Sequence, residues 1–348
     1  MTDWRDGEWR LGYSATSIHP GADLLFGRED SGIYCLNEPS VAFSDGDVAD
    51  AELPGEDGVR MGRDYQRSMT VTFDLGVDGV DRPVDRHGDM RPWAGGFKIG
   101  EWRTLYPVPG MPAKRPTGDP YQWGSDGVDL LRQAWRADAV RGRAGGVAWL
   151  RRMSAGRARM VYGRPRKFAV GKSDLTRQGY TPVVAEFVAI DDRFYDDTES
   201  SEELYDRVYQ KPQPRPGRPA VGRFESKKTA KIAQKGRVAT HPYLKIHGPC
   251  KNPKVTFAGL WAVQLSMEIK GGEYVQIDPR PWARSVMHYK GSSSSSVADR
   301  LTRSSPRLAE MLIPPGSWTA SLSASSPSGP TIGGPLVEII WRNAFAWW

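Results

Sequence analysis

Hydrophobic and polar residues alternate one by one in several short segments of the last third of the chain, from about residue 237 to residue 348. In residues 261–269 (WAVQLSMEI), Trp, Val, Leu, Met and Ile hold the odd positions, and residues 318–325 and 337–341 repeat the pattern. Because successive side chains of a strand point to opposite faces of a sheet, each segment is predicted to be a strand with one buried face. Several such strands, separated by Gly, Pro and Ser, predict an antiparallel β-sandwich or jelly roll.

Length and composition indicate how many domains the chain forms and of what kind. Its 348 residues favour two domains, and 38 Gly and 27 Pro with little long helical periodicity favour strands and loops. Residues 198–237 lack apolar periodicity and include the Pro-rich run KPQPRPGRP at 211–219. We therefore predict a mainly β protein with one helix: an N-terminal β domain over residues 1–197, a connector over 198–237 and the β-sandwich over 238–348.

One segment of the N-terminal domain has helical periodicity, at about residues 126–138. Ser125 is a suitable N-cap, and Val128, Leu131 and Trp135 recur at the spacing of one helix face. Residues 67–75 alternate and are predicted to form a strand. Residues 183–190 are nearly all apolar, which predicts a strand buried on both faces.

The sequence contains no recognisable catalytic or metal-binding pattern. Five His are scattered, and neither a G-x-S-x-G sequence nor a Walker loop occurs. We predict that the protein is not an enzyme and has no catalytic residues, metal or cofactor. Cys35 and Cys250 have no partner at metal or redox spacing and are expected to be free thiols. With no signal-peptide pattern and no long apolar run, we expect synthesis in the cytoplasm and no membrane anchor.

The net charge of +7 raises the question of nucleic-acid binding. The 48 basic residues are interspersed with 41 acidic ones, and no recognition-helix or zinc-finger pattern occurs. The strongest basic run spans residues 136–166, and we interpret it as a solvated or subunit-facing surface. Its candidate subunit-interface residues are Arg141, Arg143, Arg151, Arg152, Arg157 and Arg159.

Four segments of the last third follow one another in a recognisable order. THPYLKIHG (240–248) comes first, then GEYVQID (272–278), LIPPGSW (312–318) and VEIIWR (337–342). Their order and spacing resemble the C-terminal galectin-like module of the distal tail proteins of long-tailed bacteriophages, the siphoviruses. Upstream, residues 180–195 resemble the strand that closes the N-terminal domain of that family, and residues 67–75 resemble its early long strand.

The resemblance implies a structural protein of the virion, at the distal end of the phage tail. The N-terminal, or belt, domain would assemble head-to-tail into a hexameric ring whose lumen lets DNA pass. The implied partners are further copies of the chain, the tail tube protein, the tail-tip hub, other minor tail proteins and the tape measure protein, with DNA only in transit. A ring needs an interface whose rotation closes, and the loop-like residues 81–124 are our candidate arm for it.

The main alternative is a carbohydrate-binding adhesion protein that contacts the host cell wall, because galectin-like sandwiches often bind sugars. Its candidate sugar-facing residues are Trp282 and Tyr289. An enzyme of the tail tip, such as a wall hydrolase, ranks third because no catalytic constellation is visible. The terminal residues AFAWW (344–348) are expected to pack on their own domain or on a neighbouring subunit.

Overall fold

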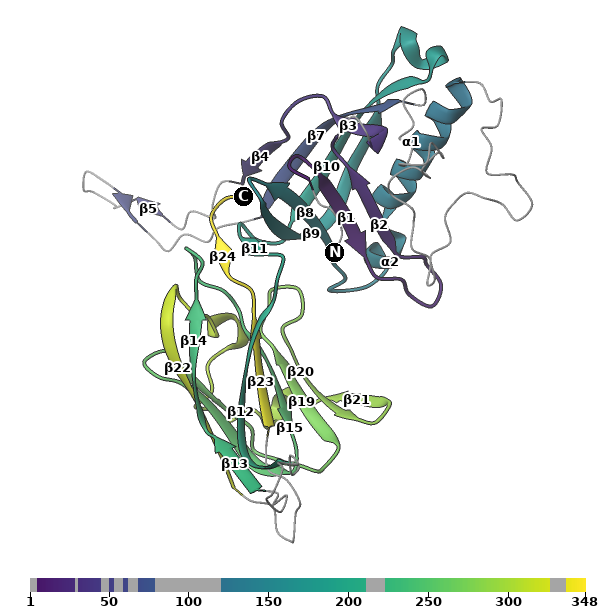
Figure 1. Cartoon of the computed structure of the whole chain (residues 1–348). Coiled ribbons are helices and arrows are strands. Elements are labelled where there is room, and N and C mark those ends of the chain that lie inside the picture. Colours follow the sequence, from purple (N-terminus) through teal and green to yellow (C-terminus); the bar gives the residue numbers. More distant parts are fainter. Residues whose placement is uncertain are drawn as a thin grey trace, which may run out of the picture. The chain divides into compact units, whose positions relative to one another are not determined.

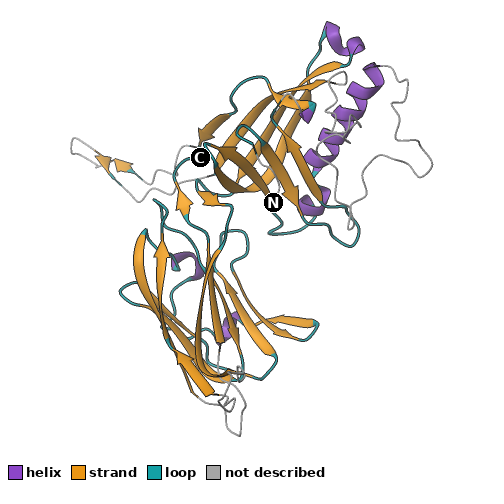
Figure 2. Cartoon of the chain, viewed as in Figure 1, coloured by secondary structure: helices purple, strands orange, loops and turns teal. Residues whose placement is uncertain are grey.

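The computed structural model describes residues 5–28, 31–44, 50–52, 59–61, 68–78, 120–210, 223–325 and 336–348. The chain divides into two compact units: unit 1 is Met1–Phe194 with Trp347–Trp348, and unit 2 is Tyr195–Ala346. Strands dominate both units, and the long helix belongs to unit 1 (Figures 1 and 2). The prediction of a mainly β fold is confirmed, and the one predicted helix is present together with a short second helix, Asp138–Arg141. Most of the candidate arm, residues 81–119, lies outside the described residues.

Unit 1 is built on a sheet with the strand order β2-β1-β8-β9-β10-β7-β3, and β4 also pairs with β7. A bridge between Gly27 and Tyr34 joins the end of β2 to β3, so the two ends of this order meet and the sheet is a nearly closed barrel. A separate two-stranded sheet contains β5 (Ala51–Glu52) and β6 (Val59–Arg60). The strands of the barrel are β1 (Trp9–Tyr13), β2 (Ala22–Phe26), β3 (Ile33–Cys35), β4 (Ser40–Phe43), β7 (Met69–Asp78), β8 (Ala148–Ser154), β9 (Arg157–Val170) and β10 (Tyr180–Ala189).

Of the strand predicted at residues 67–75, residues 69–75 form the first part of β7, where the alternation of the sequence becomes an alternation of burial. Met69 and Phe73 are fully buried, and Asp74 is exposed. The predicted burial of residues 183–190 on both faces is wrong. In β10, Phe187 is fully buried but Val188 is only half-buried, because one face packs on the interior and the other face is only partly covered.

Helix α1 (Pro120–Arg136) begins before the predicted N-cap at Ser125. Proline is favoured at the first helical position because the N–H that it lacks would have no partner there. Leu131 is fully buried as predicted, while Val128 is half-buried. The short helix α2 (Asp138–Arg141) follows α1, and the 3₁₀ helix η2 (Asp174–Gln178) lies between β9 and β10.

Trp135 joins α1 to the barrel, as the sequence predicts. Its side chain is buried, and its ring meets the rings of Phe26 and Phe73 edge-on, each at a centroid distance of 6.0 Å. Its indole Nε1 donates a hydrogen bond to the carbonyl oxygen of Glu186 at 3.1 Å. The buried face of α1 is therefore held by both aromatic packing and a polar contact.

Unit 2 is a sandwich of two antiparallel sheets, as predicted for the C-terminal domain. One sheet has the order β13-β12-β23-β15-β19-β20-β21, and the other has the order β14-β22-β16-β17, with β18 also on β16. The two sheets share one hydrophobic core, to which Val255 and Leu322 contribute from one sheet and Ile246 and Val337 from the other. The strands are β12 (Ser200–Gln210), β13 (Arg223–Lys227), β14 (Thr229–Gln234), β15 (Tyr243–His247), β16 (Cys250–Phe257), β17 (Trp261–Gln264), β18 (Glu268–Ile269), β19 (Glu273–Asp278), β20 (Ser285–Lys290), β21 (Ser293–Ser296), β22 (Gly316–Ser325) and β23 (Leu336–Trp341).

The single strand predicted for residues 261–269 is divided into β17 and β18. Strand β16, with which both pair, has a register shift between Lys251 and Lys254 in its pairing with β22, and Asn252, within this interval, has a φ of 50°. A bulge of this kind leaves one residue unpaired and interrupts the ladder locally. The predicted core positions Val263, Leu265 and Ile269 are buried.

The predicted connector over residues 198–237 contains three strands of unit 2 instead, β12, β13 and β14. Leu204 in β12 and Ile232 in β14 are fully buried in the core of the sandwich. Lys231 lies on the exposed face of β14, and Lys227, Lys228 and Lys235 lie just outside the strand, so this short amphipathic segment resembled a basic linker. The division between the units falls between Phe194 and Tyr195, near the predicted boundary at residue 197.

Each of the four segments that carry the family resemblance forms part of this sandwich. They coincide with β15, β19, the turn into β22, and β23. The closing Gly248 of the first segment cannot be another residue, because a Cβ there would lie 2.3 Å from the carbonyl oxygen of Lys270. In the third segment, Gly316 has a φ of 127°, and the indole of Trp318 donates to the carbonyl oxygen of Pro314 at 2.8 Å. The short motifs thus correspond to definite steric and hydrogen-bonding requirements.

Candidate functional surfaces

The candidate interface arginines lie on α2, β8, β9 and the adjoining turns of unit 1. Arg141 donates from its guanidinium to the carbonyl oxygen of Pro165 at 2.8 Å. The guanidinium of Arg151 lies over the ring of Trp149, 4.1 Å from its centroid. Contacts of these kinds stabilise the unit in which they form, so these two cations have a role within the fold.

Arg152 and Arg159 contact the C-terminal tryptophans, which belong to unit 1 and not to the predicted sandwich domain 238–348. Arg159 is buried and donates to the carbonyl oxygen of Trp347. Arg152 forms an ion pair with Glu38, and its guanidinium lies 5.9 Å from the ring centroid of Trp348. A role in subunit contacts remains a prediction for all six arginines, of which Arg141, Arg143 and Arg157 are exposed on unit 1.

The ring of Trp348 packs into an aromatic cluster of unit 1. It meets Trp9 at 4.9 Å and Phe194 at 4.5 Å between ring centroids, in both cases edge-on. Trp347 lies further out, with 52% of its surface exposed and its ring 6.3 Å from that of Phe43. The last two residues therefore combine one anchored tryptophan with one that faces solvent.

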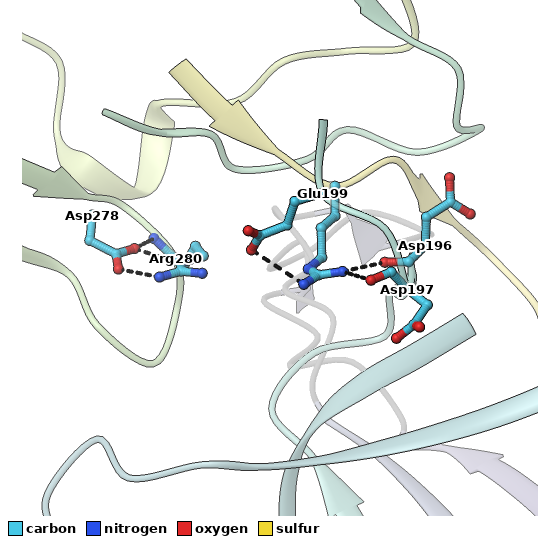
Figure 3. Close-up of polar contacts among 6 residues, drawn as sticks. Asp196, Asp197, Glu199, Asp278 and Arg280 are labelled. Carbon is cyan, nitrogen blue, oxygen red and sulfur yellow. Dashed lines mark hydrogen bonds and ion pairs between the residues drawn. The ribbon is translucent and has the colours of Figure 1, made fainter. Parts of the chain in front are cut away.

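In unit 2, Arg342 binds the chain segment that precedes β12. Its guanidinium donates to the carbonyl oxygens of Asp196, at 2.9 Å, and of Asp197, and it pairs with Oε1 of Glu199 at 3.3 Å. Figure 3 shows how these three acidic residues converge. Arg342 closes the fourth motif segment, so this motif ends in a contact that fixes the start of unit 2.

A second polar contact of unit 2 follows the end of β19. The Asp278 carboxylate receives two hydrogen bonds from Arg280, from Nε at 2.8 Å and from the terminal nitrogen at 2.6 Å (Figure 3). The guanidinium also lies 4.6 Å from the ring centroid of Tyr243. Burial, with a further contribution from Glu199, raises the pKa of the Tyr243 phenol. Asp278 is the aspartate of the second motif segment, and its structural role is to accept the two hydrogen bonds from Arg280.

The candidate sugar-facing residues Trp282 and Tyr289 are both half-buried. Trp282 has the guanidinium of Arg280 at 5.3 Å from its ring centroid, and the ring of Tyr195 meets it at 6.2 Å and 88°. Tyr289 stacks on Tyr274 with a centroid distance of 4.6 Å and an interplanar angle of 11°. Each ring already has a partner on one side, so stacking on a sugar would have to use the other side. Sugar binding stays a prediction.

The reactive side chains of the described residues are few. No group of three or more His, Cys, Asp or Glu in the described ranges is arranged to hold a metal ion. No helix there has the length and apolar character needed to cross a membrane. Cys35 and Cys250 are free thiols, and burial raises the pKa of each to about 12. Both thiols are therefore protonated at neutral pH.

Two small groups of exposed apolar side chains lie on unit 1, and of their members the sequence analysis singled out only Trp347, within the terminal AFAWW segment. One group consists of Tyr121, Val170 and Leu175, and the other of Phe43 and Trp347; each side chain is about half exposed. From sequence periodicity alone, such residues are expected in the core. Periodicity does not show where a sheet ends, and the apolar side chains at its end are exposed. Large apolar residues that share one exposed site are a feature of protein–protein contacts.

Solved structures similar to this chain include two from bacteriophages. The SPP1 Dit protein, described as a paradigm of the hub adsorption apparatus in phages that infect Gram-positive bacteria, has a TM-score of 0.46 and 11% identity, covering 97% of this chain and 99% of that chain. The phage P2 baseplate in its activated conformation with Ca has a TM-score of 0.46 and 10% identity, covering 96% of this chain and 97% of that chain. No family model matches the sequence, and no curated protein matches it significantly.

Proposed function

We propose that this chain is a structural distal tail protein of a siphovirus, which forms a hexameric ring between the tail tube and the tail-tip complex. The observation that carries the proposal is the order of the four motif segments, together with their coincidence with β15, β19, β22 and β23 of one sandwich. Taken alone, each of the four short motifs is weak evidence for the family resemblance. The four motifs occur in the order seen in that family, and each contains a residue with a steric or polar role: Gly248, Asp278, Gly316 and Arg342. A chance resemblance is therefore a poor explanation.

The proposal gives each unit its own role, as the family resemblance implies. Unit 1, the curled sheet with α1, is the ring-forming part, and unit 2 presents or receives other proteins of the tail tip. The partners of the whole protein are further copies of the chain, the tail tube protein, the tail-tip hub, other minor tail proteins and the tape measure protein. The protein resides at the distal end of the tail in the virion.

Transit of DNA through the ring requires that the lumen does not retain it. Three arginines of β8 and β9 support this reading, because Arg151, Arg152 and Arg159 contact aromatic, acidic or carbonyl groups of unit 1. Cations that are used inside a fold contribute less to phosphate binding than exposed ones do. The net charge of +7 is thus compatible with weak binding of DNA.

Mass and shape in solution test the proposal. Light scattering coupled to size exclusion should give purified full-length chain a mass near six times that of one chain, and negative-stain images should show rings with an open centre. Duplex DNA should bind weakly and be released at physiological salt. A chain that stays monomeric at all concentrations and binds duplex tightly at that salt would overturn the proposal.

A further inference from the structure

Four arginines of unit 1 are gathered where the loop after α2 is bonded to β9. Arg141, the last residue of α2, donates to the carbonyl oxygens of Pro165, at 2.8 Å, and of Arg166, at 3.3 Å. Arg164 of β9 donates in return to two carbonyl oxygens of the loop, and one of them, that of Arg143, lies 2.8 Å away. We name Arg141, Arg143, Arg164 and Arg166 the arginine cluster.

The backbone presents this cluster to solvent from both sides of the contact. The pairing of β9 with β10 shifts register at Glu186, so that two residues of β9, Arg166 and Lys167, lie opposite one residue of β10. A bulge of this kind re-aims a side chain, and both Arg166 and Lys167 are exposed. Residues 141–145 of the loop (RGRAG) are all exposed as well.

The carboxylates of the neighbouring elements already have basic partners. Asp138, the acidic residue of α2, pairs with Arg136 at 2.8 Å, and Glu186, the acidic residue of β10, pairs with Lys167 at 3.0 Å. Within the described ranges, no member of the arginine cluster forms an ion pair with a carboxylate. The charge of the cluster is therefore available to a partner from outside the unit.

The cluster concentrates positive charge at one place. Arg164 is half-buried, and the other three arginines are exposed. Burial, and after it the charges of Arg166 and Arg141, lower the pKa of the Arg164 guanidinium. The carbonyl oxygens that hold Arg141 and Arg164 are neutral, so they fix the side chains without cancelling their charge. An anion bound at this place would relieve the repulsion between the cations.

The chemistry of the surface favours a phosphodiester over an acidic protein as this anion. The cores of protein interfaces are apolar and rich in aromatic residues, whereas the exposed loop residues 141–145 are only Arg, Gly and Ala. All four cations are Arg, whose planar guanidinium binds phosphate oxygens in pairs. Segments rich in Arg and Gly, such as RGRAGG (141–146), also recur in contacts with nucleic acid that do not depend on its sequence. We infer that the arginine cluster is the surface through which this chain contacts the phosphate backbone of duplex DNA.

The inference rests on the proposed function, in which DNA passes the chain, and adds to it the residues that contact the DNA. Binding that depends on a few phosphate contacts weakens steeply as the salt concentration rises. Such a surface holds DNA at low salt and releases it at physiological salt. This is the behaviour that transit of DNA through the ring requires.

Two double variants with the same loss of charge test the inference. Arg143→Gln with Arg166→Gln removes the two members of the cluster whose guanidinium groups have no partner among the described residues. The matched control is Arg157→Gln with Arg303→Gln, which removes two exposed arginines outside the cluster. Arg157 begins β9, about 23 Å along the strand from Arg164, and Arg303 belongs to unit 2. Thermal melts check that both full-length variants fold as the wild type does.

Fluorescence anisotropy with a labelled duplex measures the dissociation constant at salt concentrations from about 20 to 150 mM. At low salt the cluster variant should bind roughly tenfold more weakly than the wild type, and its salt dependence should fall by about two units of slope, one for each lost contact. The control variant should match the wild type. A poly-glutamate chain with as many charges as the duplex should bind more weakly than the duplex, because its charges are more widely spaced.

Equal losses of duplex affinity in the cluster variant and in the control would overturn the inference, since diffuse charge would then account for the binding. A wild type that does not bind duplex at low salt, or that binds poly-glutamate as tightly as duplex, would also overturn it. Light scattering on the same samples measures ring assembly, which none of these results affects. A chain that stays monomeric at all concentrations would instead overturn the proposed function, so the two failures are distinguishable.

Discussion

Trp135 stabilises unit 1 through its ring and through its indole N–H. The ring fills the space between α1 and the rings of Phe26 and Phe73, and Nε1 bonds the Glu186 carbonyl. We expect Trp135→Ala to lower the free energy of unfolding by about 3–5 kcal/mol, since it removes a large buried side chain. Trp135→Phe keeps a ring and loses the hydrogen bond, so its cost should be smaller. Denaturant titration of the full chain measures both, and equal stability of wild type and Trp135→Ala would show that this packing is not formed.

Cys250 makes stability depend on pH in the alkaline range. The residue is fully buried, and burial raises the pKa of its thiol from 9.0 to about 12. The unfolded thiol loses its proton at a lower pH than the folded one, so its contribution to stability is complete below about pH 9 and is lost as the pH rises towards 12. We expect Cys250→Ala to flatten the fall of the melting temperature between pH 9 and 11. Both proteins carry Cys35→Ala, so that only the thiol of Cys250 differs between them. Melting temperatures that fall equally between pH 9 and 11 with and without Cys250 would contradict this prediction.

At the scale of elements, α1 and η2 are in contact through two glycines. Gly→Ala in an exposed helix interior usually stabilises by about 1 kcal/mol. At Gly124 the sign should reverse, because the added Cβ would lie 2.3 Å from the Gly179 carbonyl oxygen and 2.9 Å from its carbon. We expect Gly124→Ala to destabilise by roughly 1–3 kcal/mol. Gly142→Ala is the matched control, since the nearest atom to its Cβ is 3.4 Å away and its φ is −73°. A higher melting temperature for Gly124→Ala would show that helix propensity dominates.

The strands β12 to β14 were not predicted from the sequence, and β14 shows why. In β14, Ala230 and Ile232 face the core, while Lys231 lies on the exposed face. Three alternating residue pairs are too few to be distinguished from a basic linker by pattern alone. Pairing with β22 provides the missing information, since the partner strand buries the apolar side.

At the scale of the whole molecule, the chain ends in the unit in which it begins. Trp348 contacts Trp9 and Phe194, all of which belong to unit 1. We expect Trp348→Ala to increase amide hydrogen exchange in β1 while leaving β19 of unit 2 unchanged, because the lost contacts are those of unit 1. Peptide-resolved exchange measured by mass spectrometry makes this comparison within one sample. Equal acceleration in both strands would mean that the two units unfold together.

The sequence by itself determined the mainly β class, the alternating faces of β7, β22 and β23, the buried stripe of α1 and the order of the four motif segments. These features depend on local periodicity and on turn chemistry, which the order of residues states directly. Only the tertiary structure decided that residues 200–210 and 223–234 belong to the sandwich, that Trp348 packs in unit 1, and that Phe43 and Val170 lie uncovered at opposite ends of a sheet. The physical reason is that pairing and burial depend on partners distant in the chain, and a local pattern does not contain them.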